Sequence, residues 1–500
     1  MKLRELLVEA GVAAPANVPD VEVTGVTDNS REVQPGSLFV ALRGTRTDSH
    51  VFVPDAAARG AAAVIVGREI AAANGICQIT VKDSAHALGM LAHTVRGNPS
   101  SDMLVIGVSG TNGKTTTTFI IESILREAGY NPGVIGTIEY RYAGKRIKAS
   151  NTTPSAVMLA SMMSEMREAG VNAVAMEVSS HAIAQERIAG IEFDVAALTN
   201  ITQDHLDYHR TMEEYAAAKK RLYFDFLHRS KHKSLISEPV AVFGTDNSYG
   251  RDFAAEYRQR KLTFGLNSKA DLHATDVEYL PKGARFKVNT GDEVLEIASP
   301  LLGQFNVQNV LGAIAAAKGA GLPNQAIVDG IRKMMPVAGR FEQVDCGQDF
   351  TVIVDYAHTP DGLERVLQSA REMTSGRIVT VFGCGGDRDS RKRPIMGRIA
   401  GNLSDFVVVT NDNPRTENPV TIADMALQGV QDSRLSRDRV QVILDRRDAI
   451  HSAIRLAHAG DIVVIAGKGH EDYQILNSET IHFDDREVAR EMLQQRVPAQ

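Results

Sequence analysis

The chain has 500 residues, too many for one hydrophobic core, so about three domains are expected. Its net charge of −6 provides no general attraction for nucleic acid or anionic lipid, and its hydrophobic share of 43% is typical of a globular protein. The three cysteines lie far apart without metal-ligand spacing, which fits a reducing compartment.

The first stretch, "MKLRELLVEAGVAAP", carries charges throughout and is a poor signal peptide. No apolar run approaches the ~20 residues that span a bilayer, so membrane insertion is not expected. A cytoplasmic location is therefore predicted.

Short runs rich in Val and Ile alternate with Ala-rich helical stretches, which predicts an α/β fold with parallel sheets. Residues 1–98 hold the strands "SLFVAL" and "AAAVIVG" and end near the loop-like "RGNPSSD". Residues 99–336 begin with the strand "MLVIGV" and include a polar stretch, about 225–300, that is either a meander or an insertion. Residues 337–500 contain four strands, in "FTVIVDYAH", "RIVTVFGCGG", "DFVVVTND" and "DIVVIAGKGH". Ligands of open parallel sheets bind beyond the carboxyl ends of such strands.

The stretch "GVSGTNGKTTTT" joins the strand "MLVIGV" to a predicted helix. Backbone N–H groups of such a loop, with the helix N-terminus behind them, attract phosphate. Lys114 can reach terminal phosphates and the Thr115 hydroxyl can bind Mg²⁺. One residue departs from the general P-loop pattern, because Val108 stands where a glycine is usual. The alternative is a Gly-rich turn that binds nothing, but the lysine and threonine favour nucleotide binding.

Two polar groups follow further strands of this segment. Glu177 ends "NAVAMEV", where a carboxylate can hold Mg²⁺ against phosphate oxygens, although a lone glutamate there is more often solvated. "TNITQDHLDYH" brings together Asp204, His205, Asp207 and His209. A zinc site would need a further separated ligand, so a magnesium or phosphate contact through His205 is favoured, with helix capping by Asp204 as the alternative.

The stretch "MEEYAAAKKRLYFDF" predicts an amphipathic helix. Lys219 and Lys220 are by default solvent-exposed there, and the pattern itself gives no reason to expect otherwise.

The stretch "TNDNPRTENP" displays Asp412, Asn413, Pro414 and Arg415 together. Asp, Asn and Pro are common turn residues, so a polar turn is one interpretation. The other is a grip on a small ligand that carries both a carboxylate and an ammonium group.

The motifs "GTNGKTT", "NTTPS", "MEVSSHAIAQERI", "TNITQDHLDYH", "YAAAKKRLY", "GQFNVQNV", "GRFE", "DYAHTPD", "FGCGGDRD", "DNPRTENP" and "AGKGHEDYQ" resemble those of the Mur ligases of peptidoglycan synthesis, and occur in the same order. The resemblance covers about residues 25–487 and is strongest to the branch that adds diaminopimelate. It implies an N-terminal UDP-binding domain (1–98), a central P-loop ATP-binding domain (99–336) and a C-terminal Rossmann-like amino-acid-binding domain (337–500).

The resemblance also implies the reaction and its partners. ATP phosphorylates the D-glutamyl carboxylate of a UDP-linked muramoyl dipeptide with the help of Mg²⁺, and the amine of meso-diaminopimelate displaces phosphate. The expected partners are these small molecules, with no nucleic acid and no membrane insertion, and a monomer is expected.

Site residues carried over from the family fall into four groups. The ATP group is Gly110, Thr111, Asn112, Gly113, Lys114, Thr115, Thr116, Asn306, Asn309, Arg340, Asp355 and His358. The magnesium group is Thr115, Glu177, His205 and Lys219, with Lys219 matching a lysine that the family carries as a carbamate. The UDP-muramoyl dipeptide group is Asp28, Ser30, Thr45, Arg46, Thr47, Asn151, Thr152, Thr153, Ser179, Gln185 and Arg187. The diaminopimelate group is Arg388, Asp412, Asn413, Pro414, Arg415, Gly467 and Glu471.

"DNPR" is the family's signature for diaminopimelate rather than lysine. Arg415 can bind the far carboxylate of diaminopimelate through two hydrogen bonds, while Asp412 and Asn413 can accept from ammonium groups. Three rivals remain: a folylpolyglutamate synthetase, a lysine-adding Mur ligase, and a nucleotide-binding switch without catalysis.

Overall fold

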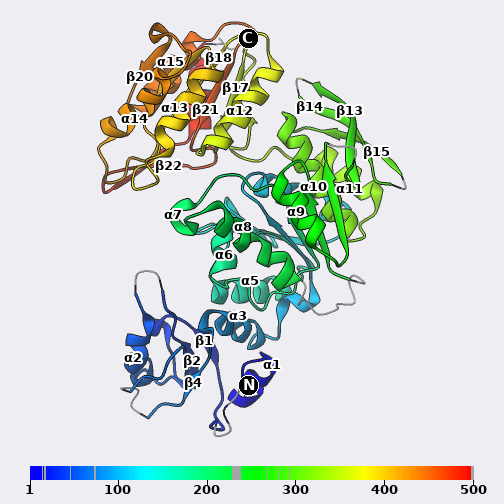
Figure 1. The fold of residues 1–500 in the computed structure, drawn as a ribbon, viewed down its shortest axis with the longest axis vertical. Coiled ribbons are helices and arrows are strands. Elements are labelled where there is room, and N and C mark those ends of the chain that lie inside the picture. The colour runs from blue at the N-terminus through cyan, green and yellow to red at the C-terminus, as the bar shows by residue number, and fades with distance from the viewer. Residues whose placement is uncertain are drawn as a thin grey trace.

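The computed structural model describes residues 1–13, 15, 18–44, 47–71, 75–227, 238–266, 269–280, 282–291 and 293–496. Thr45 and Arg46, predicted to contact the UDP substrate, lie outside the described residues. Three α/β domains follow one another along the longest axis, with the N-terminal domain at one end and the C-terminal domain at the other (Figure 1). This arrangement confirms the predicted α/β fold with parallel sheets.

The N-terminal domain is built on a parallel sheet of strand order β1-β2-β3-β4. Its elements are α1 (Leu3–Glu9), β1 (Gly25–Thr27), β2 (Ser37–Val40), α2 (Val53–Ala58), β3 (Ala63–Val66), β4 (Gln78–Thr80) and α3 (Ser84–Thr94). Helix α3 lies against the middle domain, where His86 Nδ1 is 2.9 Å from Glu186 Oε2. Gly89 allows this approach, because a Cβ there would lie 2.5 Å from the carbonyl oxygen of Ala189.

The middle domain contains the largest sheet, of order β15-β14-β13-β12-β11-β10-β5-β9-β6-β7-β8 among the described strands. Its elements are β5 (Leu104–Ser109), α4 (Lys114–Glu127), β6 (Pro132–Ile135), β7 (Glu139–Tyr142), β8 (Lys145–Lys148), α5 (Ala156–Glu168), β9 (Ala173–Glu177), α6 (Ser180–Ala184), β10 (Val195–Leu198), α7 (Leu206–His209), α8 (Met212–Arg221), β11 (Val240–Gly244), α9 (Ser248–Glu256), β12 (Lys261–Gly265), β13 (Leu272–Leu280), β14 (Gly283–Asn289), β15 (Val294–Ser299), α10 (Gln304–Gly319) and α11 (Asn324–Lys333).

Within this sheet, the strands from β13 to β6 are parallel. The pairings β13-β14-β15 at one edge and β6-β7-β8 at the other are antiparallel. The polar stretch near residues 225–300 therefore resolves into two elements of the parallel sheet and a meander, β13–β15, on its edge.

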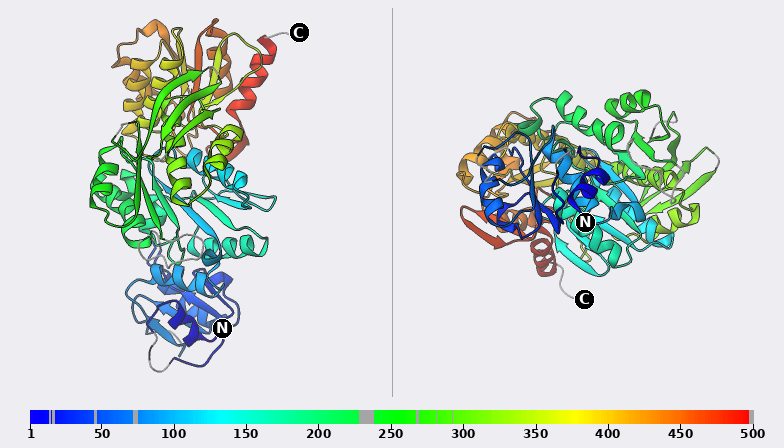
Figure 2. Two further views of the ribbon diagram at one scale, coloured as in Figure 1. Left: turned by 90° about the vertical axis from the view of Figure 1, so that its right-hand side faces the viewer. Right: turned by 90° about the horizontal axis from the view of Figure 1, so that it is seen from below.

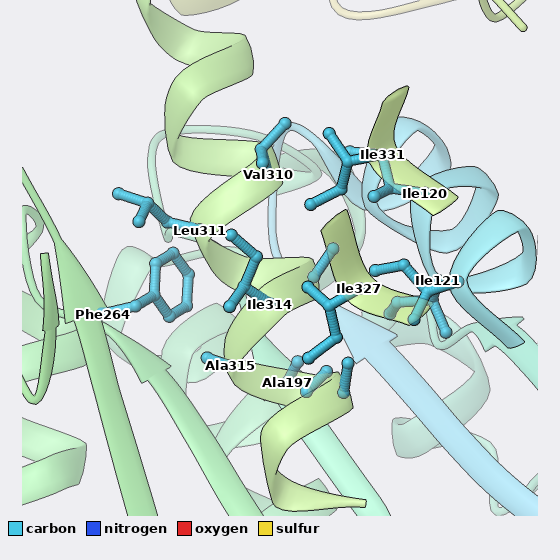
Figure 3. Packing of buried hydrophobic residues seen from close by; sticks show 14 of the residues in the cluster. Ile120, Ile121, Ala197, Phe264, Val310, Leu311, Ile314, Ala315, Ile327 and Ile331 are labelled. Atoms are coloured by element: carbon cyan, nitrogen blue, oxygen red, sulfur yellow. The ribbon is translucent and has the colours of Figure 1, made fainter. Parts of the chain in front are cut away.

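One apolar cluster fixes the helix behind the Gly-rich loop. Ile120 and Ile121 of α4 pack with Ile314 of α10 and with Ile327 and Ile331 of α11, and all are fully buried (Figure 3). The apolar residues of α4 recur at helical spacing, so one side of this helix faces the core while its first turn faces the cavity described below. Burial of this kind contributes roughly 1.5–3 kcal/mol per isoleucine.

The C-terminal domain has a sheet of order β16-β17-β21-β18-β19-β20, parallel from β17 to β20. Its elements are β16 (Glu342–Gln343), β17 (Thr351–Asp355), α12 (Pro360–Met373), β18 (Ile378–Phe382), α13 (Lys392–Leu403), β19 (Phe406–Val409), α14 (Pro419–Gln431), β20 (Val440–Val442), α15 (Arg446–Leu456), β21 (Ile462–Ala466), β22 (Tyr473–Leu476), β23 (Glu479–His482) and α16 (Asp485–Arg496).

The four strands expected in this segment are β17, β18, β19 and β21. Helix α16 packs against α15 and lies on the outside of the domain (Figure 2). Among the described residues, no helix has the length and apolar character required to cross a bilayer.

Candidate active site

The Gly-rich loop lies between β5 and α4, as the sequence predicts. Gly110 has φ +148° and Gly113 has φ +84°, and a Cβ at either would lie within about 2.1 Å of a neighbouring oxygen. Val108, the departure from the general P-loop pattern, is a buried residue of β5 paired in register with Glu177 of β9. The loop therefore begins after this valine, and a glycine at that position is not needed here.

Two lysines converge on one carbonyl oxygen of this loop. Lys114 Nζ donates to the Gly110 oxygen at 3.0 Å and to the Thr111 oxygen at 2.8 Å, and Lys219 Nζ donates to the Gly110 oxygen at 2.8 Å. Lys219 is only 1% exposed, so the default expectation of a solvated lysine is wrong for this residue. Lys220 instead pairs with Glu256 at the surface, at 2.6 Å.

The electrostatics of these lysines follow from their burial. Burial lowers the pKa of Lys114, although Glu177 and Asp204 act in the opposite direction. Burial, with the charge of Lys114 next to it, lowers the pKa of Lys219 well below its usual range. Lys219 is thus held as a neutral amine more readily than an ordinary lysine.

A cavity of about 240 Å³ lies beside the loop and is lined by both the middle and the C-terminal domains. The predicted ATP and metal residues that line it are Thr111, Asn112, Gly113, Lys114, Thr115, Thr116, Glu177, His205, Asn309, Arg340, Asp355 and His358. Asn306 lies behind this wall, where its Oδ1 accepts from Asn309 Nδ2 at 2.9 Å. Lys219 lies under the loop rather than on the cavity wall.

The groups predicted to bind magnesium are oriented by neighbours. Both carboxylate oxygens of Glu177 accept from Thr137, from the backbone N–H at 2.8 Å and from the hydroxyl at 3.0 Å. The pKa of His205 is lowered to about 4 by burial, so the imidazole is neutral near pH 7 and can act as a ligand. A hydroxyl, a carboxylate and a neutral imidazole on one cavity wall fit a divalent cation such as Mg²⁺.

The C-terminal domain contributes directly to this cavity. Arg340 Nη2 donates to the Thr115 hydroxyl at 3.2 Å, and the Arg340 guanidinium lies 4.5 Å from the ring centre of Tyr356. Burial raises the pKa of Asp355 to about 6, while Arg340 acts against this shift. Asp361, in the first turn of α12, accepts at Oδ2 from Asn112 Nδ2 at 2.5 Å and from the Thr202 hydroxyl at 3.0 Å.

The residues predicted to contact the UDP substrate lie on two domains. Asp28 and Ser30 follow β1 in the N-terminal domain, and Thr47 lies between β2 and α2. The middle-domain members form one network: Arg187 donates to the Thr153 carbonyl at 2.9 Å and to Gln185 Oε1 at 2.7 Å. The Thr153 hydroxyl donates to the carbonyl of Glu177 at 2.9 Å, which ties this network to the cavity.

The remaining members of this network come from the same edge of the sheet. Thr152 lines the cavity, and the carbonyl of Asn151 accepts from the Tyr140 hydroxyl at 2.6 Å. Ser179 caps helix α6 by accepting from the backbone N–H of Ala182.

The residues predicted to bind diaminopimelate come from three loops at the carboxyl ends of β18, β19 and β21. Gly386 and Gly467 permit the loops to meet, because a Cβ at Gly386 would lie 1.9 Å from the Pro414 carbonyl oxygen and one at Gly467 would lie 2.7 Å from Asp412 Oδ2. Arg415 has φ +51° and donates to the Gly386 carbonyl at 2.8 Å. Arg388 is exposed and donates to the Asp387 carbonyl at 3.0 Å.

Asn413, predicted to accept from a substrate ammonium group, has hydrogen-bond partners within the protein on both of its side-chain polar atoms. Its Oδ1 accepts from Lys468 Nζ at 3.1 Å and from the backbone N–H of Ile475 at 2.9 Å, and its Nδ2 donates to Glu471 at 3.0 Å. Both lone pairs of this oxygen are used within the protein, so the predicted acceptance from a substrate ammonium requires one of these contacts to be exchanged. Asn413 holds the loops together, which leaves Asp412 and Glu471 as the acidic groups for a substrate.

Sequence comparisons place this geometry in a known family. The chain matches the Mur ligase middle domain over residues 108–317, the Mur ligase glutamate ligase domain over 339–469 and the Mur ligase family catalytic domain over 22–96. It is 46% identical to the UDP-N-acetylmuramoyl-L-alanyl-D-glutamate–2,6-diaminopimelate ligase of Thermosynechococcus vestitus, over 99% of both chains. The chain belongs to the Mur ligase family.

Solved structures agree with this assignment. This Mur ligase superposes on a structure of a UDP-N-acetylmuramoyl-L-alanyl-D-glutamate–2,6-diaminopimelate ligase with a TM-score of 0.71 and 33% identity, over 99% of each chain. It also shares its fold with a folylpolyglutamate synthase of Mycobacterium tuberculosis, with a TM-score of 0.61 and 20% identity, over 75% of this chain and 91% of that one.

Several cavity residues of this Mur ligase were not singled out from sequence: Thr137, Asn200, Phe305, Gln308, Tyr356, Thr359 and Arg365. Thr137 and Asn200 follow strands β6 and β10, so the strand-end rule could have indicated them. Phe305 and Gln308 belong to α10, where helical spacing alone gives no sign of a cavity.

Proposed function

We propose that this Mur ligase adds meso-2,6-diaminopimelate to UDP-N-acetylmuramoyl-L-alanyl-D-glutamate at the expense of ATP, in peptidoglycan synthesis. The observation that carries the proposal is full-length similarity to ligases of that name, at 46% identity over 99% of both chains. The C-terminal domain supports it, because it contributes both Arg340 to the nucleotide cavity and the 412–415 loop to the amino-acid site.

The reaction begins with transfer of the γ-phosphoryl group of ATP to the D-glutamyl carboxylate, which breaks the β–γ phosphate bond and releases ADP. Lys114 and Arg340 neutralise charge on the transferring group. The amine of diaminopimelate then attacks the acyl carbon, the acyl C–O bond breaks, phosphate leaves and the amine proton passes to solvent. Correct placement of three substrates can contribute ~7–11 kcal/mol to the rate.

We propose that Thr115 and Glu177 hold Mg²⁺ on the cavity wall, that His205 helps to place a second ion, and that Lys219 adds a ligand once it is carbamylated. When bound, the cation would supply positive charge that stabilises the phosphoryl group during transfer. Thr115, Glu177 and His205 carry oxygen and neutral nitrogen donors. Thr137 fixes both oxygens of the Glu177 carboxylate.

Lys219 is proposed to act as a carbamate. Its neutral amine adds to CO₂ and loses one proton to water, which leaves an anion where an ordinary lysine carries a cation. The burial of Lys219 and the lowered pKa of its amine support this reaction, because only the unprotonated amine reacts. A carboxylate at this position would compensate Lys114, which now shares the Gly110 carbonyl with Lys219.

The 412–415 loop is proposed to select diaminopimelate over lysine. Nη1 of Arg415 donates to the carbonyls of Gly386 and Asn413, and the other guanidinium N–H groups have no partner among the described residues. They can bind the far carboxylate of diaminopimelate, which lysine lacks. Asp412 and Glu471 would receive the ammonium group.

The UDP-linked substrate is proposed to bind across two domains. Asp28, Ser30 and Thr47 would contact its uridine end, and the Thr152, Ser179 and Arg187 region would place its dipeptide end near the cavity. Because both sites come from one chain, we propose that the protein acts as a monomer. Its nucleotide substrates favour a place in the cytoplasm.

The direct test is phosphate release with ATP, Mg²⁺ and UDP-muramoyl dipeptide, with diaminopimelate or lysine as the third substrate. Release that depends on diaminopimelate, and stops when Mg²⁺ is withheld, is the expected result. Preference for lysine would assign the protein to the lysine-adding branch. Release with a folate and glutamate instead would favour the folylpolyglutamate synthase reaction, although that fold match spans only 75% of this chain.

A further inference from the structure

Lys468 is a fully buried lysine in the loop that follows β21. Its side chain is 0% exposed, and it belongs to none of the groups assigned above. A buried ammonium is costly unless charged or polar partners surround it. Its partners are therefore informative.

Those partners are three residues of the proposed amino-acid site. Lys468 Nζ lies 3.1 Å from Asn413 Oδ1, 3.3 Å from Glu471 Oε2 and 3.7 Å from Asp412 Oδ1. The ring centre of Tyr473 lies 5.6 Å away. A single cation thus touches residues of both loops, 411–415 and 467–471.

Asn413 extends this contact into a network. It donates from Nδ2 to Glu471, and its Oδ1 also accepts from the backbone N–H of Ile475. The Gln474 side chain donates to the Asp412 carbonyl at 2.8 Å. Lys468 therefore contacts both acidic side chains and the amide that joins their loops.

A second buried cation holds the same loops by their backbone alone. Arg446 pairs with Asp485, at 2.7 Å, and donates to the carbonyls of Asn411 and Ala466. This pair is internally neutral, whereas Lys468 faces the side chains of two acids. The charge of Lys468 is therefore part of the site itself.

The charges that the two loops withdraw from solvent bear on the choice of substrate. Asp412 and Glu471 provide two carboxylates, and Lys468 and Arg415 provide two cations. The other charged member of the predicted group, Arg388, is exposed, so solvent screens its charge. Burial raises the pKa of Glu471 and Asp412 acts in the same direction, whereas Lys468 and the hydrogen bond from Asn413 act against this shift. Diaminopimelate has two ammonium and two carboxylate groups and is neutral, whereas lysine carries one net positive charge.

We propose that Lys468 is a positioning and specificity-determining residue, which holds Asp412, Asn413 and Glu471 in place and makes the site electrostatically neutral, so that it favours a neutral amino acid over a cationic one. This inference rests on the proposed function and adds to it. Without Lys468 the site gains one net negative charge. Lysine should then be disfavoured less strongly relative to diaminopimelate.

The test uses the full chain with Lys468→Met, which removes charge and hydrogen bonds, and Lys468→Gln, which keeps a donor for Asn413. Initial rates of phosphate release give KM for diaminopimelate, KM for ATP, and the ratio of kcat/KM for lysine to that for diaminopimelate. For both variants, we expect KM for diaminopimelate to rise at least about tenfold, and the ratio to rise, with KM for ATP within about twofold of the parent. The rise in KM should be larger for Lys468→Met.

Lys261→Met is the matched control, because Lys261 donates to the carbonyls of Ala254 and Tyr257 in the middle domain, away from both sites. An unchanged KM for diaminopimelate, an unchanged lysine ratio, or equal increases in all KM values would overturn the inference. If Lys468→Met does not fold, Lys468→Gln alone decides by the same criteria. A parent protein without diaminopimelate-dependent phosphate release would refute the proposed function instead, before any variant is compared.

Discussion

The phosphate loop and the amino-acid loops differ in how their charges are compensated. Around residues 110–115, Lys114 donates to the Gly110 carbonyl and Arg340 approaches from the other domain, so two cationic side chains lie at the loop without a bound anion. Around residues 411–415, Lys468 already lies between Asp412 and Glu471, so charges are balanced within the protein. The first site attracts any polyphosphate, whereas the second can select a ligand by shape and charge.

The comparison predicts that loss of a cation at the phosphate loop is the most damaging change. Lys114→Ala should lower diaminopimelate-dependent phosphate release by at least about 10³-fold, because charge on the transferring phosphoryl group is no longer compensated. Stopped-time phosphate assays measure this effect. Lys333→Ala, at a surface pair with Glu127, is the control. Turnover by Lys114→Ala close to that of the parent would show that the loop is misassigned.

The Lys219→Ala variant tests whether carbamylation gives Lys219 a negative charge beneath the loop. Lys219→Ala should lower turnover by at least about 10²-fold, since a metal-compensating carboxylate would be lost. Short carboxylic acids added to the assay should partly restore activity by filling the space. Lys220→Ala, whose lysine pairs with Glu256 at the surface, should behave as the parent. A fully active Lys219→Ala variant is incompatible with the carbamate proposal.

Arg415 tests the selective site. Arg415→Ala should raise KM for diaminopimelate by roughly 30–100-fold and leave KM for ATP within about twofold, because the proposed ligand of this guanidinium is the amino acid and not the nucleotide. Arg391→Ala, an exposed arginine paired with Asp389, is the control. Equal changes in both KM values would mean that Arg415 supports the domain rather than the substrate.

The smallest effect is expected at the hydrogen bonds between Asp361 of the C-terminal domain and the middle domain. Asp361→Asn should raise KM for ATP by about threefold, because the carboxylate that accepts from Asn112 and Thr202 across the domain boundary is neutralised. Glu364→Gln, on the exposed side of the same helix, provides the comparison. A KM for ATP identical to that of the parent would remove Asp361 from the nucleotide site.

Sequence reasoning succeeded where local patterns dictate local structure. The strand, glycine turn and helix at residues 104–127 follow from an apolar run, two glycines and a helical period, and the structure contains them. The four C-terminal strands are likewise visible as Val- and Ile-rich runs. Candidate ligands at strand ends follow from the same rule.

Local sequence patterns did not predict which polar side chains are buried, because that burial depends on distant segments. Lys219 and Lys220 look alike in the sequence, yet one lies against the Gly110 carbonyl and the other at the surface. Asn413 looks like an open acceptor, but Lys468 and Ile475, more than fifty residues away along the chain, occupy its oxygen. No local pattern marks Lys468 as buried, because its partners come from another loop.

The α/β layering, the position of the phosphate loop and the family follow from periodicity, glycines and ordered motifs, which are properties of short segments. Three features are visible only in the folded chain: which lysine is buried, which domain completes the nucleotide cavity and which polar groups remain open to a substrate. These depend on desolvation and on hydrogen bonds between segments that fold together from far apart, and neither can be read from neighbours in the chain.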